Sequence, residues 1–243
     1  ELKDKPGDTA RLGYQGIRAS YSDLTAKKLF KARGEACQNI GYHTFEAVFD
    51  ALASGEVDYA LVPAENSLVG SIHTVSDLLL SRETSVLDEE LWAIHHCLAA
   101  LPGASIDDLR KITSHPVALG QCSKSIQQLG IPTVESFDTA GAAESLQCDG
   151  DRSLGVICSR EAAQMYGLAV LSDDITDHQQ NETRFLLLGM QDEPISNDQQ
   201  VKTSLAFAVD DRSGALAQCL SIFSDRGINL TRLESRPRPG APW

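Results

Sequence analysis

Polar residues follow two short apolar segments, at positions where a protein with parallel strands would hold a ligand. Glu65-Asn66-Ser67 comes soon after the apolar segment 59–62, and Ser114-His115-Pro116 follows the segment 111–113. Parallel sheets bind ligands beyond the carboxyl ends of their strands. We therefore expect donors from both segments to face one bound molecule. Asn and Ser also favour turns, so a purely turn-forming role for Asn66 and Ser67 is the alternative.

Helix geometry brings further donors to the same place. Gln121 lies seven residues after Ser114, which is about two helical turns and therefore on the same face. Ser114 would otherwise serve only as a helix cap. Tyr21 and Ser22 stand at the start of a predicted helix, whose free N–H groups suit a carboxylate. The alternative is that Ser22 only caps this helix and Tyr21 only packs.

Thr183 and Arg184 begin another predicted strand. The guanidinium of Arg184 is always charged and its geometry suits a carboxylate. Successive side chains of a strand point to opposite faces, so the two residues serve one site only if the chain bends there. Taken alone, Thr183 is an ordinary β-branched residue of a strand.

Composition excludes several classes of function. The 243 residues carry a formal net charge of −13, which argues against nucleic acid and against anionic membranes. No apolar run approaches the roughly 20 residues that cross a bilayer. The histidines lack the spacing of zinc ligands, and packing is the better interpretation for each of them. They are His43, His73, His95, His96, His115 and His178.

Predicted strands and helices alternate along the first 190 residues. We predict strands over 11–14, 59–62, 91–98, 111–113, 133–137, 154–158 and 184–189, and helices over 20–30, 44–54, 75–80, 116–129, 139–147 and 159–166. This alternation predicts an α/β fold with parallel sheets covered on both faces. A polar linker over 191–200 precedes a second β-α-β unit, with strands over 201–210 and 228–234 and a helix capped by Ser213.

Several motifs, in this order along the chain, resemble the prephenate dehydratase family, which includes arogenate dehydratases. They are Gly13-Tyr14-Gln15-Gly16 with Ala19-Ser20-Tyr21-Ser22, Pro63-Ala64-Glu65-Asn66-Ser67 with Gly70-Ser71-Ile72, Ser114-His115-Pro116 with Gln121-Cys122, and Asn181-Glu182-Thr183-Arg184-Phe185. The tail resembles the start of an ACT regulatory domain, through Gly214-Ala215-Leu216 and Asn229-Leu230-Thr231 with Glu234-Ser235-Arg236-Pro237.

The resemblance implies a two-lobed catalytic domain like type II periplasmic binding proteins over 9–190, the linker over 191–200, and the N-terminal part of an ACT domain over 201–243. It implies a lyase that removes CO₂ and the ring hydroxyl from prephenate to give phenylpyruvate, without metal or organic cofactor. Arogenate, giving phenylalanine directly, is the alternative substrate. A non-enzymatic two-lobed small-molecule-binding protein is a second alternative, because the fold alone does not fix function.

The resemblance also assigns roles to residues of this chain. Thr183 is implied as proton donor to the leaving hydroxyl. The implied catalytic residues are Thr183, Asn66, Ser114 and Gln121, and the implied substrate-binding residues are Tyr21, Ser22, Glu65, Ser67, Asp138, Thr139, Arg184 and Phe185. The run from Thr139 to Ala143 resembles the plant and algal branch, where use of arogenate is common.

The tail and one loop carry further implications. Phenylalanine, as effector of the full-length protein, is expected near Leu216, Glu234, Ser235 and Arg236. The resemblance implies a dimer or tetramer, in the cytoplasm or, in a plant or alga, in the plastid stroma. Ala19 stands where the family often has Gly. If this loop needs a positive φ, Ala19 is strained there.

Overall fold

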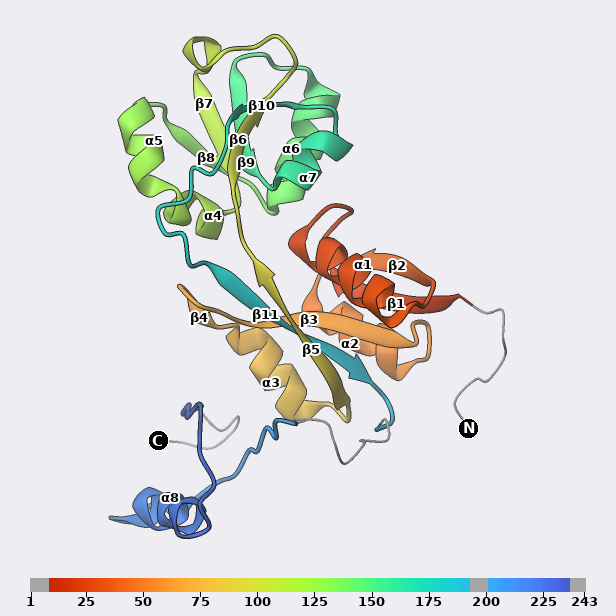
Figure 1. Ribbon diagram of the computed structural model, residues 1–243, viewed down its shortest axis with the longest axis vertical. Coiled ribbons are helices and arrows are strands. Elements are labelled where there is room, and N and C mark those ends of the chain that lie inside the picture. Colours follow the sequence, from red (N-terminus) through yellow and green to blue (C-terminus); the bar gives the residue numbers. More distant parts are fainter. Residues whose placement is uncertain (1–8, 193–200, 237–243) are drawn as a thin grey trace. The chain divides into compact units, whose positions relative to one another are not determined.

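The computed structural model describes residues 9–192 and 201–236 (Figure 1). The chain divides into two compact units, with the boundary between Ile195 and Ser196, and each is described by itself. Most of the predicted linker, residues 193–200, lies outside the described residues. The first unit consists of two lobes, each built on its own sheet.

The first lobe has the strand order β2-β1-β3-β11-β5, with the short β4 paired to β3. Strands β1 and β2 and strands β1 and β3 run parallel, whereas β11 is antiparallel to both β3 and β5. Helix α1 packs on one face of the sheet, and α2 and α3 pack on the other. The elements are β1 (Ala10–Gln15), α1 (Tyr21–Arg33), β2 (Cys37–Tyr42), α2 (Phe45–Ala53), β3 (Tyr59–Asn66), β4 (Gly70–Ser71), α3 (His73–Ser81), β5 (Ser85–Ala93) and β11 (Glu182–Gly189).

The second lobe has the strand order β10-β6-β9-β7-β8. Strand β7 is parallel to β8 and β9, and β6 is antiparallel to β9 and β10. Its elements are β6 (Cys97–Ala100), the 3₁₀ helix η1 (Ile106–Asp108), β7 (Lys111–Ser114), α4 (Pro116–Gln121), α5 (Ser123–Leu129), β8 (Thr133–Glu135), α6 (Thr139–Asp149), β9 (Leu154–Cys158), α7 (Arg160–Met165) and β10 (Ala169–Ser172).

The chain crosses between the lobes twice, at residues 94–96 and again at 173–181. Figure 1 shows both crossings side by side between the two sheets. Backbone hydrogen bonds join them, from Ile94 N–H to the Asn181 carbonyl and from Ile175 N–H to the His96 carbonyl. The structure thus has the predicted two-lobed α/β fold.

The prediction of parallel sheets was wrong in part, because both sheets are mixed. Strand β11 returns from the second lobe and enters between β3 and β5 in the antiparallel sense. The predicted strand 91–98 is divided between β5 and β6, since the first crossing interrupts it. The strand predicted over 59–62 continues through Pro63 to Asn66, and the helix predicted over 116–129 is divided at Cys122. Strands β2, β4 and β10 were not predicted.

Helix starts follow the capping rules. Ser20 caps α1, Thr44 caps α2 and Asp138 caps α6, each by accepting a backbone N–H. Ser114, however, does not cap α4. His115 takes that position, and its Nδ1 accepts from the Val117 N–H at 3.2 Å.

The second unit contains helix α8 (Ala215–Asp225), which begins after Gly214 rather than at a Ser213 cap. Its described residues form no strands, although 201–210 and 228–234 were predicted as strands. A strand needs a hydrogen-bonded neighbour, and an isolated two-stranded pair is marginal in water. Within the described residues, no helix combines the length and apolar character that a membrane span requires.

Candidate functional site

Asn66 and Thr183 are partners in the ladder between β3 and β11. The Asn66 Oδ1 accepts the backbone N–H groups of Leu68 and Val69 at 3.0 and 3.1 Å, which fixes the orientation of its amide. The Asn66 Nδ2 therefore points the other way and donates to Thr183 Oγ1 at 3.0 Å. Because the threonine oxygen accepts this bond, its own proton is left to be donated elsewhere.

Asn181 completes this group, although we gave it no role from the sequence. Its Oδ1 accepts from Asn66 Nδ2 at 2.7 Å. Its own Nδ2 is buried and has no hydrogen-bond partner among the described residues. Ser67 ties the neighbouring chain in place, since its Oγ accepts the Glu182 N–H at 2.9 Å and donates to the Gln180 carbonyl at 3.3 Å. Ser67 thus positions the segment that carries Thr183.

Arg184 points to the opposite face of β11. Its Nε lies 2.9 Å from Glu65 Oε1, and its Nη1 lies 3.3 Å from Glu89 Oε2. Strand β11 keeps its register with β5 here, and its register with β3 shifts between Arg184 and Phe185, after the ion pair. Arg184 and Glu65 form an ion pair on the face opposite Thr183, and their predicted role in binding substrate stays a prediction.

Phe185 was also predicted to bind substrate, and this role stays a prediction. Its ring is 2 % exposed and packs in the core beneath α1 with Leu12, Tyr14 and Leu187. Phe185 is two residues after Thr183 on β11 and therefore lies on the same face of the sheet, where α1 covers it. Phe185 thus stabilises the fold.

A second hydrogen-bonded group joins the lobes at the crossings. Tyr21 begins α1, and its hydroxyl lies 2.7 Å from the His95 carbonyl and 3.0 Å from His96 Nδ1. The other ring nitrogen, His96 Nε2, lies 3.0 Å from Gln121 Oε1 at the end of α4. Burial lowers the pKa of His96 and raises the pKa of Tyr21 well above its ordinary value. Both groups are therefore neutral at pH 7.

The remaining predicted residues of this region are buried. Ser114 is fully buried and its hydroxyl donates to the Ile157 carbonyl at 2.6 Å, which commits its proton to the backbone. Ser22 is also buried, in the first turn of α1. The catalytic role of Ser114 and the binding role of Ser22 stay predictions. The sequence interpretation of His96 as a packing residue missed its two hydrogen bonds.

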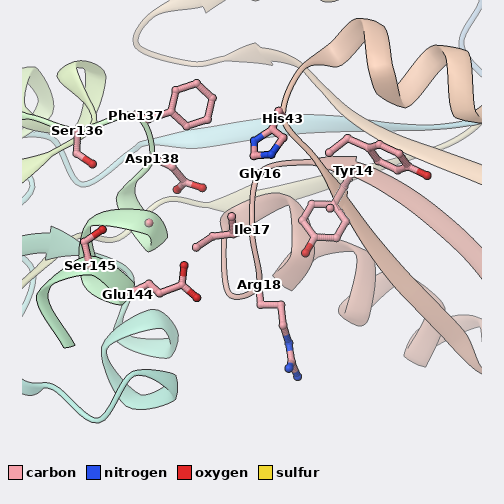
Figure 2. A pocket seen from close by; sticks show the side chains of 13 residues that line it. Tyr14, Gly16, Ile17, Arg18, His43, Ser136, Phe137, Asp138, Glu144 and Ser145 are labelled. Atoms are coloured by element: carbon pink, nitrogen blue, oxygen red, sulfur yellow. The ribbon is translucent and has the colours of Figure 1, made fainter. Parts of the chain in front are cut away.

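A cavity of about 470 Å³ opens between the lobes. Figure 2 shows Ile17 of the first lobe pointing toward Asp138 and Glu144 of the second lobe, whereas the Arg18 side chain extends away from these two carboxylates. The Asp138 Oδ1 accepts the Ala140 N–H at 2.8 Å, whereas its Oδ2 is buried without a hydrogen-bond partner in the described part of the chain. Thr139, the next residue, is half-buried. The cavity thus combines carboxylates with one guanidinium.

The loop that leads into α1 is strained, as expected. Ala19 has a φ of 64°, a conformation that normally requires glycine. Its N–H donates to Asp23 Oδ2 at 2.8 Å, and Lys27 and Asn39 hold the same carboxylate. This network keeps the loop in place and presents Ser20 and Tyr21 at the crossing.

The four predicted effector residues lie in the second unit. Leu216 is exposed on α8, and Glu234 forms an ion pair with Arg232. Ser235 and Arg236 stand at the end of the described residues. In the described ranges, His, Cys, Asp and Glu side chains form no group of three or more that could hold a metal ion.

The two lobes are joined by two crossings, and Thr183 accepts a hydrogen bond from the Asn66 amide beside the second of them. These features define a two-lobed α/β protein with hydrogen-bonded polar groups at the crossings. The sequence profile of the family described as Prephenate dehydratase matches residues 12–193. The chain therefore belongs to the prephenate dehydratase family, as the motifs indicated.

Individual relatives agree with this membership. The curated "Arogenate dehydratase/prephenate dehydratase 1, chloroplastic" of Arabidopsis thaliana is 38 % identical over 243 residues, covering 99 % of this chain and 61 % of that protein. The solved prephenate dehydratase of Arthrobacter aurescens in complex with L-Phe has a TM-score of 0.80 and 27 % identity, covering 95 % of this chain and 77 % of that one.

A third relative carries a different name. The solved structure titled "GqqA- a novel type of quorum quenching acylases" has a TM-score of 0.77 and 30 % identity, covering 95 % of this chain and 83 % of that one. The chain spans about three fifths of the length of the Arabidopsis relative and of other curated relatives.

Proposed function

We propose that this chain carries the catalytic domain of a lyase that converts prephenate into phenylpyruvate in phenylalanine biosynthesis. The hydrogen bond from Asn66 to the Thr183 hydroxyl, within a matched prephenate dehydratase domain, is the observation that supports it most directly. This bond leaves the threonine proton available beside Asn181, where the second crossing ends.

The reaction requires the protein mainly to position the substrate and to donate one proton. The ring hydroxyl of prephenate leaves while the ring carboxylate departs as CO₂, and aromatisation drives both steps. A threonine hydroxyl is a weak acid, but accepting a hydrogen bond polarises its O–H and makes it a better donor. A positioned proton donor contributes about 10² to 10⁴ in rate. Thr183 serves as that donor, and Asn66 orients it.

A direct assay tests this proposal. The protein is incubated with prephenate, and phenylpyruvate is followed by its absorbance in alkali. Turnover well above the slow acid-catalysed reaction of a protein-free control supports the proposal. Binding of prephenate without turnover would instead support the small-molecule-binding alternative.

Arogenate is the second candidate substrate, and the cavity between the lobes favours it. Arogenate carries an ammonium group where prephenate has a keto group. The unpartnered Oδ2 of Asp138 needs a hydrogen-bond donor, and Arg18 of the same cavity offers a partner for the adjacent carboxylate. The printed names of the curated relatives include arogenate dehydratases.

The substitution Asp138→Asn separates the two substrates. Asparagine caps helices as well as aspartate does, so α6 keeps its start while the negative charge is lost. We expect kcat/KM for arogenate to fall by about tenfold or more, as loss of a charged hydrogen bond does, with little change for prephenate. Equal losses for both substrates would remove Asp138 from ammonium recognition.

Amide hydrolysis, suggested by the name of the acylase relative, is checked by following acid release from an acylated amine.

We further propose the domain boundaries and assembly given by the motifs. Residues 9–190 form the catalytic domain, 191–200 link it onward, and 201–243 belong to an ACT domain. Phenylalanine is the effector, near Leu216, Glu234, Ser235 and Arg236, in a dimer or tetramer. The L-Phe complex of the Arthrobacter relative and the chloroplastic name of the Arabidopsis relative support the effector and a plastid location. Calorimetric titration with phenylalanine tests the effector.

A further inference from the structure

His96 occupies a position that the motifs leave without a role. Its side chain is 2 % exposed and lies on the first crossing between the lobes. One ring nitrogen faces Tyr21 of the first lobe and the other faces Gln121 of the second lobe. The ring therefore sits between two residues that the family resemblance places at the substrate.

Proton counting restricts how these three side chains are arranged. A neutral imidazole has one donor nitrogen and one acceptor nitrogen, and the tyrosine hydroxyl has a single proton. In the first arrangement the Tyr21 hydroxyl donates a three-centre hydrogen bond to the His95 carbonyl and to His96 Nδ1, and His96 Nε2–H donates to Gln121 Oε1. In the second, Tyr21 donates to the His95 carbonyl, His96 Nδ1–H donates to Tyr21, and the Gln121 amide is reversed so that its NH₂ donates to Nε2.

The two arrangements offer opposite groups of Gln121 to a ligand. The first leaves the amide NH₂ free as a donor, and the second leaves the carbonyl oxygen as an acceptor. In the structure Oε1 faces His96, and Nε2 has no hydrogen-bond partner among residues 9–192. The chemistry of the ligand distinguishes the two orientations of the amide. Prephenate and arogenate both carry carboxylates and a hydroxyl, which favour the donor.

We propose that His96 is a positioning residue which, as its Nε2–H tautomer, holds the Gln121 carbonyl so that the amide NH₂ faces the substrate. This inference rests on the proposed lyase function of the same site. His96 does not touch the substrate, and it acts through Gln121. Tyr21 anchors the other side of the ring to the first lobe, so the orientation of Gln121 is set where the two lobes meet.

Two substitutions of different length test the inference. In His96→Gln the new amide N–H reaches the place of Nε2–H and still donates to Gln121. In His96→Asn the shorter amide reaches only the place of Nδ1, so Gln121 loses its partner. We expect kcat/KM to fall by about 10- to 100-fold in His96→Asn and by about threefold or less in His96→Gln, at similar melting temperatures. Equal activity of the two variants would overturn the proposal.

A cycle with Gln121→Ala adds a measurement that a purely structural role would not move. If His96 acts through Gln121, then His96→Asn costs little further activity once Gln121→Ala is present. Additive losses would overturn the proposal. If Gln121 binds the substrate in its ground state, the loss should appear mainly in KM. If Gln121 binds the departing hydroxyl, the loss should appear mainly in kcat.

Nuclear magnetic resonance of the ¹⁵N-labelled protein reads the tautomer without any assay of turnover. The His96 signals, assigned by their loss in His96→Gln, should show a protonated Nε2 and a bare Nδ1 at pH 7. A protonated Nδ1 would overturn the proposal even if the variants did not fold. If the protein turned over neither prephenate nor arogenate, the lyase function would fail while this tautomer measurement would still decide what His96 holds.

Discussion

The two faces of β11 differ in what their neighbouring polar side chains are bonded to. On the α1 face, Thr183 accepts from a neutral amide and keeps its proton. On the other face, Arg184 is held by the two carboxylates Glu65 and Glu89. We therefore expect these adjacent residues of one motif to have different roles, Thr183 in the proposed proton donation and Arg184 in the stability of the sheet. Three of the following four changes test that division, beginning with the largest expected effect, and the fourth tests the strained loop before α1.

Removing the threonine hydroxyl should have the largest effect. We expect Thr183→Ala to lower kcat by about 10² or more, because the proton donor is lost. The cavity left by one hydroxyl and one methyl is small, so thermal unfolding followed by circular dichroism should change little. Thr183→Ser keeps the hydroxyl and is the matched control. If Thr183→Ala kept wild-type turnover, the proposed difference in role between the two faces of β11 would be wrong.

Reversing the hydrogen bond to Thr183 should have the second-largest effect. In Asn66→Asp the group facing Thr183 becomes an acceptor, which draws the threonine proton away from the substrate. The carboxylate still accepts from the Leu68 and Val69 N–H groups, and the unpartnered Nδ2 of Asn181 can turn to donate to it. We expect kcat to fall by about 10- to 100-fold with the fold retained. An unchanged kcat in steady-state assays would show that the direction of this bond is irrelevant.

Arg184→Met should affect stability rather than chemistry. It leaves the carboxylates of Glu65 and Glu89 close together without their shared cation. Because all three side chains are partly exposed, solvent screens the repulsion, and we expect a loss of about 1 to 2 kcal/mol in the free energy of unfolding. Urea denaturation measures this loss. A fall in kcat comparable to that of Thr183→Ala would place Arg184 at the reacting site after all.

Ala19→Gly should have the smallest effect and the opposite sign. Glycine relieves the cost of a φ of 64°, which is about 1 to 2 kcal/mol. Glycine also loses more chain entropy on folding than alanine does, which offsets part of this gain. We expect a net gain near 0.5 kcal/mol in the free energy of unfolding, seen as a slightly higher melting temperature. Gly16→Ala, at a φ of 116°, is the control and should lower the melting temperature.

Local signals predicted much of the fold. Ser20, Thr44 and Asp138 cap their helices because short polar side chains compete for the first N–H groups, and this preference is visible in the sequence. The break between β5 and β6 was missed because the apolar pattern runs on through the crossing. The antiparallel entry of β11 was also missed, since it pairs with β3 about 120 positions earlier in the chain, beyond the reach of local pattern.

The site was predictable in a different way. The motifs named Asn66 and Thr183, but spacing alone could not show that these residues are direct partners in a ladder. The opposite directions of Thr183 and Arg184 followed from strand alternation, and the ion pair to Glu65 confirms that geometry. His96 was missed because a histidine beside an apolar strand most often packs. Only the positions of Tyr21 and Gln121, brought together by the crossings, reveal its hydrogen bonds.

The late arrival of β11 has a consequence for synthesis on the ribosome. This strand lies between β3 and β5, yet it is translated after the whole second lobe. Until then the nascent first lobe has two unpaired inner edges, while the second lobe already has all of its strands. The second lobe can therefore mature first, and the first lobe waits with exposed strand edges that are open to aggregation or chaperones.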